Sequence, residues 1–556
     1  MSRPPVSSSL FDVIVVGAGS AGIGVCYNLA MKYPSIKILL LERGSSAVAP
    51  TASRTPLLSL YSSWFSSKLK PFQRQYTTVA EEALNNRTLG ITRGMGFGGS
   101  SLLDDMQYLR GPQSDVASWN SKTWTWDVLT DTLRRVQRNS RDNKLMHGDH
   151  GPLAVTDASC ALTNSNLNVR FFQACEAAGM PSSVDFNDGV CDGQGTAQSF
   201  INRGARVDVF DAMMMENKHR TKNLDVRSSK NVAKLLMSDS RECLGVVLDD
   251  GEEIRSGRVI VCGGAIETPA LLMRSGIGNS DALKAAGVPP IVHNEGVGAN
   301  LIANPSVDFT FRLENEYATE LTRPRSFNFL NVPVMYKQWK EYMDEGTGFF
   351  SSPHEAMAFV RSENGLLTPN LSIQFICAPL LEQGRKWANF PGYTARVALH
   401  RPKSRGSVSL TSNGSVAVAT GMYSEMEDIK AMDEGLMWVG LLCSADSSLQ
   451  SGYYQLPTTE LSFDAPFNGL KPILAQPKEV VGTAKAAEAL LRSTSFVGQS
   501  LFGTCAMGTV VNDTLQVNGV SNGSLLVADS SVVPTTTLGN SRTWNLSIGL
   551  RCADLL

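Results

Sequence analysis

The sequence predicts an α/β fold in which a discontinuous Rossmann-type nucleotide-binding domain is joined to a second, α+β domain with an antiparallel sheet. Three observations lead to this expectation. A glycine-rich turn joins a strand to a helix near the N-terminus, two later segments return to the same sheet, and alternating runs occur in the second half of the chain. The 556 residues also exceed the roughly 250–300 that a single core usually reaches.

The first βαβ unit is expected at residues 11–44. Residues 11–16 are apolar, rich in β-branched side chains and followed by glycine, which is typical of a buried strand. Apolar positions at helical spacing follow over 21–32, and residues 36–41 form a second apolar run. A strand, a helix and a strand in this order form the unit from which parallel sheets are built.

The turn Gly17-Ala18-Gly19-Ser20-Ala21-Gly22 has the GxGxxG spacing of a dinucleotide-binding loop. Gly17 permits the tight turn, Gly19 lets the backbone approach a pyrophosphate, and Gly22 lets the helix pack closely on the strand. The N-terminus of the helix then faces the phosphates. Glu42 ends the second strand, where an acidic side chain accepts hydrogen bonds from ribose hydroxyls.

Two later segments are expected to add strands to the same sheet. Residues 258–262 are apolar and run into Gly263-Gly264 and a helix over 269–274. Residues 525–529 form another short strand, and a helix over 546–555 follows. The nucleotide domain is therefore expected to be assembled from the start, the middle and the end of the chain.

The segment 301–480 has a different pattern. Residues 394–400 and 406–410 alternate between apolar and polar side chains, with a turn expected at 402–406. This alternation is typical of antiparallel strands that bury one face.

The composition limits the partners. A net charge of −2 argues against nucleic acid and anionic membranes, which require a basic surface. No run approaches the 18 apolar residues of a membrane span, and the polar N-terminus does not resemble a signal peptide. The ten cysteines lack CxxC or zinc-site spacing, so free thiols, no bound metal and a cytoplasmic location are expected. The oligomeric state is left open.

Later sequence motifs distinguish between the dinucleotide ligands that a GxGxxG turn alone leaves open. They occur, in order, at 93–101, 106–111, 263–278, 503–508, 527–534 and 539–541. Together with the first turn, these segments resemble those of the glucose–methanol–choline (GMC) oxidoreductase family over essentially the whole chain.

The resemblance implies FAD as the cofactor. It places FAD-binding segments at 1–150, 222–300 and 491–556, the last of which also carries the catalytic-site segment. It places a substrate domain at 151–221 and 301–490, with a sheet that roofs the isoalloxazine ring.

The resemblance also implies particular cofactor contacts. Gly98, Gly99 and Ser100 would lie along the flavin and the pyrophosphate, and the backbone of Val232 would touch adenine. The full expected set is Gly17, Gly19, Ser20, Gly22, Glu42, Arg43, Gly98, Gly99, Ser100, Asp104, Val232, Asp529, Ser530, Asn540 and Ser541. Asp104 stands where the family usually has Asn, and a carboxylate there would oppose an anionic reduced flavin unless it is protonated or turned away.

Both catalytic positions depart from the family pattern. The His that removes the hydroxyl proton is replaced by Ser500, next to Gln499, and an unassisted serine cannot act as such a base. The second position, usually His or Asn, is Arg542. Arg542 could bind an acidic substrate or an oxyanion, or it could form a salt bridge with Asp104.

The remaining histidines offer few substitutes for the lost base. His400, at the end of an alternating strand, is the best candidate, although a packed sheet histidine is the competing interpretation. His354 lies in a loop that could line the pocket, and His147 lies in a polar loop and is expected to be exposed.

Three hypotheses follow for the function. The first is FAD-dependent oxidation of an alcohol or related C–H donor, with an apolar or carboxylate-bearing small molecule as substrate. The second is other flavin-based chemistry, such as photodecarboxylation, isomerisation, cyclisation or lyase activity. The fatty-acid photodecarboxylase branch of the family typically has Cys where this chain has His400. The third is an FAD-binding protein without catalysis.

Overall fold

The computed structural model describes residues 11–47, 51–61, 69–157, 166–313, 332–348, 350–352, 355–443, 473–477 and 483–556. His354 lies outside these residues, so its placement is not described. None of the helices in these ranges is both long enough and apolar enough to cross a membrane. The nine cysteines that fall in the described ranges are buried, and none of them forms a disulfide with another described cysteine.

The first sheet draws its strands from the start, the middle and the end of the chain, as predicted. In spatial order the strands are β11 (Leu224–Arg227), β2 (Ile38–Leu41), β1 (Phe11–Val16), β14 (Glu253–Val261), β13 (Cys243–Leu248) and β12 (Val232–Met237), with β27 (Leu525–Val527) also paired to β14. The pairs β11–β2, β2–β1, β1–β14 and β14–β27 are parallel. The parallel part is therefore a Rossmann-type sheet.

Three helices of this part of the fold begin earlier than predicted. They are α1 (Ser20–Lys32), α9 (Gly264–Arg274) and α14 (Ser541–Leu555). In α14 the side chain of Asn540 accepts a hydrogen bond from the Thr543 N–H and caps the helix. The helix therefore begins at Ser541, five residues before the predicted start at 546. Helix α1 packs directly against α14, although the two lie at opposite ends of the sequence.

The second sheet is antiparallel, as predicted. Its strands in order are β25 (Ile473–Gln476), β17 (Ile302–Arg312), β22 (Gly392–Leu399), β19 (Leu371–Ile376), β18 (Ala356–Val360) and β7 (Gly193–Thr196), with β26 (Phe496–Phe502) also paired to β17. Helix α12 (Met426–Cys443) packs on β22 and β19, where Gly435 lies against Val397. The last segment of the chain thus contributes β26 to this sheet and β27 to the first.

One predicted pairing is wrong. Residues 407–410 form β23 (Ser407–Leu410), which pairs with β24 (Val416–Ala419) in a separate two-stranded sheet rather than with β22. The chain leaves the second sheet at Arg401 because the backbone N–H of Lys403 and of Ser404 donate to the buried carboxylate of Asp428 on α12. Two hydrogen bonds to one carboxylate turn the segment away from the expected hairpin.

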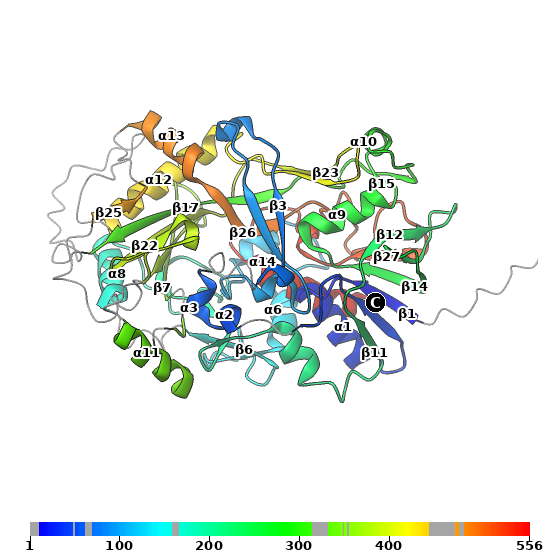
Figure 1. Ribbon diagram of the computed structural model, residues 1–556, viewed down its shortest axis with the longest axis horizontal. Helices are drawn as coiled ribbons and strands as arrows, with labels where there is room; N and C mark the ends of the chain where they lie inside the picture. The colour runs from blue at the N-terminus through cyan, green and yellow to red at the C-terminus, as the bar shows by residue number, and fades with distance from the viewer. Residues whose placement is uncertain are drawn as a thin grey trace, which may run out of the picture.

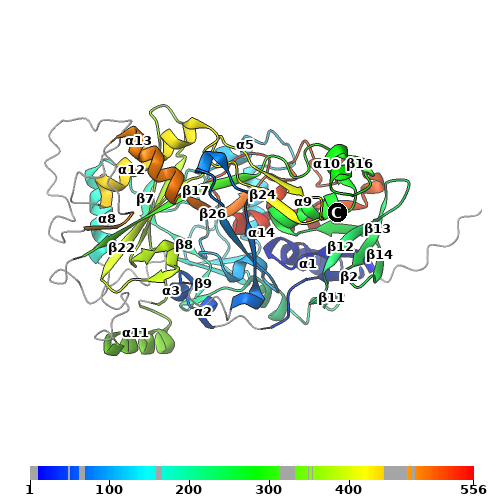
Figure 2. The ribbon, with the colours of Figure 1, turned by 45° about the horizontal axis from the view of Figure 1, so that its top comes forward.

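The two large sheets lie towards opposite ends of the long axis of the molecule, as Figure 1 and Figure 2 both show. The hairpin of β3 (Gln73–Thr77) and β4 (Gly90–Gly94) lies between them together with β26. This arrangement places segments from several distant parts of the sequence around the space between the sheets.

Candidate active site

A cavity of about 440 Å³ lies between the two sheets. One end is formed at the carboxyl ends of β1, β2 and β14, which is where open parallel sheets bind their ligands. The other end is lined by side chains of β17, β19 and β22, and the hairpin β3–β4 and strand β26 form further walls. Its volume falls within the range of small-molecule sites in proteins.

Two different structural requirements explain why glycine occupies these positions of the first turn. Gly17 has a φ of +103°, and a Cβ atom there would lie 2.6 Å from the carbonyl oxygen of Cys262. A Cβ atom on Gly22 would clash with the carbonyl oxygen of Gly17. At Gly19, which lines the cavity, a Cβ atom would meet no atom of the described chain within 4 Å. The space beside Gly19 therefore fits a group that approaches the backbone closely, such as a pyrophosphate.

Glu42 is buried at the end of β2 and lines the same end of the cavity. Its carboxylate accepts hydrogen bonds from the N–H groups of Ala18 (2.9 Å), Gly44 (2.7 Å) and Gly96 (3.0 Å). Burial raises the pKa of this carboxyl above its ordinary value, and these three N–H groups oppose that rise. Glu42 thus binds together the loops that surround a nucleotide, in addition to the ribose contact that its position predicts.

The second glycine run lies directly on the first. The Gly98 N–H donates to the Ala18 carbonyl at 2.9 Å, and a Cβ atom on Gly99 would lie 2.8 Å from the Cα atom of Gly19. The hydroxyl of Ser100 accepts a hydrogen bond from the Gly94 N–H at 3.1 Å. Gly99 and Ser100 line the cavity, whereas Gly98 supports the turn from behind.

The other expected cofactor residues fall into two groups. Arg43, Val232, Ser530, Asn540 and Ser541 line the cavity together with Ser20 and Asp104. Asp529 is buried and is not part of the lining; its carboxylate accepts hydrogen bonds from the Gly264 N–H (2.8 Å) and the Thr268 hydroxyl (2.6 Å). Asp529 therefore shapes the Gly264 turn, which lines the cavity, rather than facing the cavity itself.

Arg542 is buried and forms the salt bridge that was one of its two predicted roles. Its Nη1 atom lies 3.3 Å from Asp104 Oδ1, and its Nη2 donates to the Val207 carbonyl at 2.5 Å. The guanidinium carbon lies 4.1 Å from the centroid of the Phe200 ring. Arg206 holds the same Asp104 oxygen at 2.6 Å, so two guanidinium groups balance this carboxylate.

Ser500 and Gln499 belong to β26 and both line the cavity. The Ser500 hydroxyl accepts a hydrogen bond from the Ser541 N–H at 3.0 Å, at the first residue of α14. The side-chain oxygen of Gln499 accepts from the Asp105 N–H at 2.9 Å, and the Gln499 carbonyl accepts from Arg93 at 2.5 Å. Both side chains thus have positioning contacts within the protein.

His400 follows β22 and lines the cavity from the second sheet. Its Nε2 lies 2.7 Å from the Ser372 hydroxyl, and its Nδ1 lies 3.5 Å from the side-chain nitrogen of Asn304. Burial, together with the charge of Arg401, lowers its pKa to about 4. This environment keeps the imidazole neutral and makes it a weak base.

The second sheet presents polar side chains to the cavity. Asn304, Gln374 and Arg396 line it from β17, β19 and β22. The side-chain oxygens of Asn304 and Gln374 are buried without a hydrogen-bond partner among the described residues. Strand alternation could have identified these residues, because Arg396 and His400 lie on one face of the strand that the sequence predicted.

Sequence reasoning also missed Asp105, which stands beside Asp104 and lines the cavity. Its Oδ1 lies 3.4 Å from the Gln107 N–H. Burial raises the pKa of its carboxyl above the ordinary value, while Arg396, the Gln107 N–H and Arg206 oppose the rise. The pair of adjacent acids at 104–105 was the signal available in the sequence.

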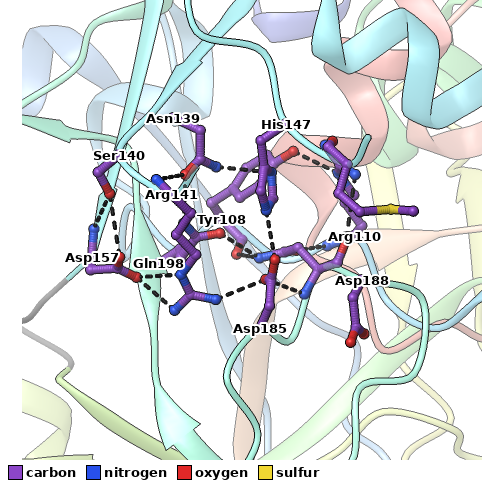
Figure 3. A network of polar contacts seen from close by, with 12 residues as sticks. Tyr108, Arg110, Asn139, Ser140, Arg141, His147, Asp157, Asp185, Asp188 and Gln198 are labelled. Carbon is purple, nitrogen blue, oxygen red and sulfur yellow. Dashed lines mark hydrogen bonds and ion pairs between the residues drawn. The ribbon is translucent and has the colours of Figure 1, made fainter. Parts of the chain in front are cut away.

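The prediction that His147 is exposed is wrong. Figure 3 shows its imidazole between Asn139 and Asp185. The side-chain N–H of Asn139 donates to Nδ1 (3.1 Å), and Nε2–H donates to Asp185 (2.6 Å). Arg141 extends the network from Asp185 (2.8 Å) to Asp157. Partners that are distant in sequence bury this one histidine of the polar loop, which local polarity alone does not reveal.

The same network supports the floor of the cavity. In Figure 3 Tyr108 and Arg110 lie beside it, and the Arg110 Nε–H donates to the Tyr108 hydroxyl at 2.7 Å. Asn187 accepts from the Arg110 N–H at 2.8 Å and donates to the Tyr108 carbonyl at 3.2 Å. These hydrogen bonds fix the backbone at Tyr108 and Arg110. They therefore also hold in place the neighbouring segment from Asp104 onward, in which Gln107 lines the cavity.

Comparison with known proteins identifies the family. Profiles of the GMC oxidoreductase family match residues 11–306 with the N-terminal part and residues 402–549 with the C-terminal part. An alcohol dehydrogenase [acceptor] from Pseudomonas putida is 29% identical over 98% of this chain and 96% of its own. The mitochondrial choline dehydrogenase of Homo sapiens is 27% identical over 98% of this chain and 89% of its own.

Solved structures share the fold. Pyridoxine 4-oxidase from Mesorbium loti superposes with a TM-score of 0.80 at 24% identity, covering 98% of both chains. A formate oxidase of Aspergillus oryzae in which one arginine is replaced by alanine gives a TM-score of 0.84 at 23% identity, covering 98% of this chain and 97% of the other. The family match extends over most of the chain and includes the glycine turns and β26 at the cavity, whose open space beside Gly19 fits the cofactor. The chain belongs to the GMC oxidoreductase family and is an FAD-dependent oxidoreductase.

Proposed function

We propose that this enzyme oxidises the hydroxyl-bearing carbon of a small polar alcohol. The observation that carries the proposal is the single continuous lining that joins the glycine turn at Gly19 to the polar side chains of Asn304, Gln374 and Arg396. Such a lining allows a donor held against the second sheet to reach the ring of a cofactor anchored in the first. Bound FAD would supply the acceptor for two electrons and a proton from that carbon.

The residues that line the nucleotide end would hold the cofactor. Gly19 and the N-terminus of α1 fit the pyrophosphate, and Glu42 and Val232 fit the ribose and the adenine. Gly99, Ser100, Ser530 and Ser541 fit the remaining length towards the flavin ring. In this proposal the Asp529 carboxylate acts indirectly, through the turn at Gly264.

A polar donor follows from the chemistry of the second-sheet wall. The buried oxygens of Asn304 and Gln374 accept hydrogen bonds, so a ligand must bring donors to them or leave them unsatisfied. Hydroxyl groups supply such donors. Similar proteins carry the names alcohol dehydrogenase, choline dehydrogenase and pyridoxine 4-oxidase, which fits an alcohol carbon as the site of oxidation.

An acidic substrate anchored on Arg542 receives less support. Both Nη atoms of Arg542 have protein partners, Asp104 and the Val207 carbonyl, and its guanidinium stacks on Phe200. A carboxylate ligand would have to displace these contacts. Arg542 therefore fits a role in balancing Asp104 at the edge of the cavity.

The experiment is anaerobic reduction of the purified yellow protein by a panel of alcohols: aliphatic, aromatic, polyhydroxylated and choline. We expect bleaching of the visible flavin band, with polar alcohols faster than apolar alcohols of the same length. If no alcohol bleaches the band, and a carboxylic acid loses CO₂ under blue light, photodecarboxylation replaces the proposal. A flavin that no donor reduces, in the dark or in light, would point to a binding role.

A further inference from the structure

The site contains no free imidazole base in the part of the chain that the structure describes. His400 is neutral and bonded to Ser372, and the Ser500 hydroxyl accepts from the backbone of Ser541. Oxidation of an alcohol nevertheless requires a group that takes the hydroxyl proton. We propose that the carboxylate of Asp105 is the catalytic base that accepts this proton, an inference that rests on the proposed alcohol oxidation.

The position of Asp105 supports this role. It lines the cavity together with Gly99 and Ser100 and with the polar side chains of the second sheet, and the charge of Arg396 on β22 acts on it. Its backbone N–H donates to the Gln499 side chain at 2.9 Å, and the next residue, Met106, has a φ of +60°. These two features fix the direction of the turn at Asp105 and Met106. The hydrogen bond from the Asn187 side chain to the Tyr108 carbonyl holds this turn further.

The carboxylate of Asp105 makes no ion pair with any residue in the described ranges, although three arginines lie near it. Arg396 on β22 is held in a bidentate pair by Asp308, at 2.6 and 2.9 Å. Arg206 on β10 (Ala205–Arg206) and Arg542 on α14 are both held by Asp104. Asp105 therefore keeps acceptor capacity for a ligand.

Its protonation behaviour fits general base catalysis. Burial raises the pKa of the Asp105 carboxyl, and a base works best when its pKa approaches the working pH. The charged and titratable groups that face it are Arg396 from β22, Arg206 from β10, Arg542 from α14, Asp104 on its own loop and His400 after β22. Arg396 and Arg206 oppose the rise in the Asp105 pKa, and His400 is uncharged at neutral pH.

The oxidation removes one proton and one hydride from the alcohol. The O–H bond of the alcohol breaks and its proton passes to a carboxylate oxygen of Asp105. The C–H bond breaks with both electrons leaving as hydride, for which bound FAD would supply the acceptor, and the carbon–oxygen double bond forms. The donor is oxidised by two electrons, and the proton on Asp105 returns to solvent before the next turnover.

The first test uses sulfite, which binds oxidised flavin and bleaches its visible band, so it needs no substrate. A carboxylate beside the flavin ring repels this anion, and Asp105→Asn removes the charge with almost no change in shape. We expect the variant to bind sulfite at least about tenfold more tightly than the wild type above the carboxyl pKa. The difference should disappear as the pH falls and Asp105 becomes protonated in the wild type.

Two further variants make the test specific. Asp105→Glu should restore the pH-dependent weakening of sulfite binding, and Asp281→Asn, at a 93% exposed side chain, should behave like the wild type. Retention of FAD and an unchanged thermal midpoint show that each variant is folded. Equal sulfite affinities of Asp105→Asn and the wild type at every pH would overturn the proposal.

The second test is the rate of anaerobic flavin reduction by the best alcohol. Loss of a general base lowers such a rate by about 10²–10⁴-fold, which we expect for Asp105→Asn, with partial recovery in Asp105→Glu. Reduction of Asp105→Asn at the wild-type rate would refute Asp105 as the base. If no alcohol reduces the wild type, the proposed function fails, while the sulfite titration still decides whether Asp105 titrates beside the flavin.

Discussion

At the residue scale, the pKa of His400, lowered to about 4, has a consequence for stability. Below pH 6.5 the unfolded chain protonates this histidine and the folded chain does not, so stability falls as the pH decreases from about 6.5 to 4. Between pH 7 and pH 5 this single group costs about 2 kcal/mol. His400→Gln, which cannot titrate, should therefore lose about that much less stability over the same interval.

The measurement is urea unfolding of both proteins at pH 7 and pH 5. His150→Gln is the matched control, because the side chain of His150 is 91% exposed and its removal should leave the pH dependence unchanged. An equal loss of stability in His400→Gln and the wild type would show that His400 is not held neutral.

The same scale separates what the sequence could predict about the site from what it could not. The glycine turn, Glu42 and the pairing of Arg542 with Asp104 were predictable, because local motifs or opposite charge specify them. The base was not. Asp105 acquires its role from the arginines of β22, β10 and α14, each of which is already paired with another acid. Such a balance depends on residues that only the fold brings together.

At the scale of elements, Glu267 of α9 connects the hairpin β3–β4 to the first domain. Its carboxylate accepts a hydrogen bond from the Tyr76 hydroxyl at 2.7 Å. It also lies within 3.5 Å of Arg43, Arg74 and Arg274. In Glu267→Gln these three cations would lose their common counterion, and the hairpin that walls the cavity would open more readily.

We expect FAD to dissociate about tenfold faster from Glu267→Gln, because the hairpin has lost its charged attachment. The rate follows from the rise in flavin fluorescence after dilution. Glu253→Gln, which removes an exposed acid whose ion-pair partner among the described residues is Arg255, is the control and should release FAD at the wild-type rate. Equal release rates for Glu267→Gln would show that other contacts hold the hairpin.

The contact between α1 and α14 gives a second prediction for an element. A Cβ atom on Gly549 would clash with the carbonyl oxygen of Ala21, so Gly549→Ala must separate the two helices. We expect a loss of about 1–3 kcal/mol in unfolding free energy and weaker FAD retention, since α14 carries Ser541 at the cavity. Gly257→Ala, whose Cβ would make an ordinary 3.4 Å contact, should be nearly neutral.

At the scale of the whole molecule, the strand order shows why sequence patterns were sufficient for the fold class but not for every pairing. The strands β1, β2, β14 and β27 contain the apolar runs that were predicted as strands of one sheet. The parallel strand β11 was not predicted, because Asp225 and Arg227 interrupt its apolar residues. The partner of residues 407–410 was not predictable, because it depends on Asp428, which lies on a distant helix. Hydrogen bonds from a backbone segment to a carboxylate on a distant helix leave no periodic pattern in the sequence.

The cavity between the two sheets also predicts how the molecule responds to its cofactor. Hydrogen–deuterium exchange of the apoprotein, with FAD and with ADP, measures this response by segment. ADP can fill only the nucleotide end, so it should protect the turn at Gly17–Gly22 but leave β26 and the hairpin β3–β4 exchanging as in the apoprotein. FAD spans the cavity and should protect all three.

At the same concentration FAD should also raise the thermal midpoint further than ADP, because its additional contacts lower its dissociation constant. Equal protection of β26 by ADP and FAD would mean that the second sheet closes on the nucleotide alone, without contact to the flavin.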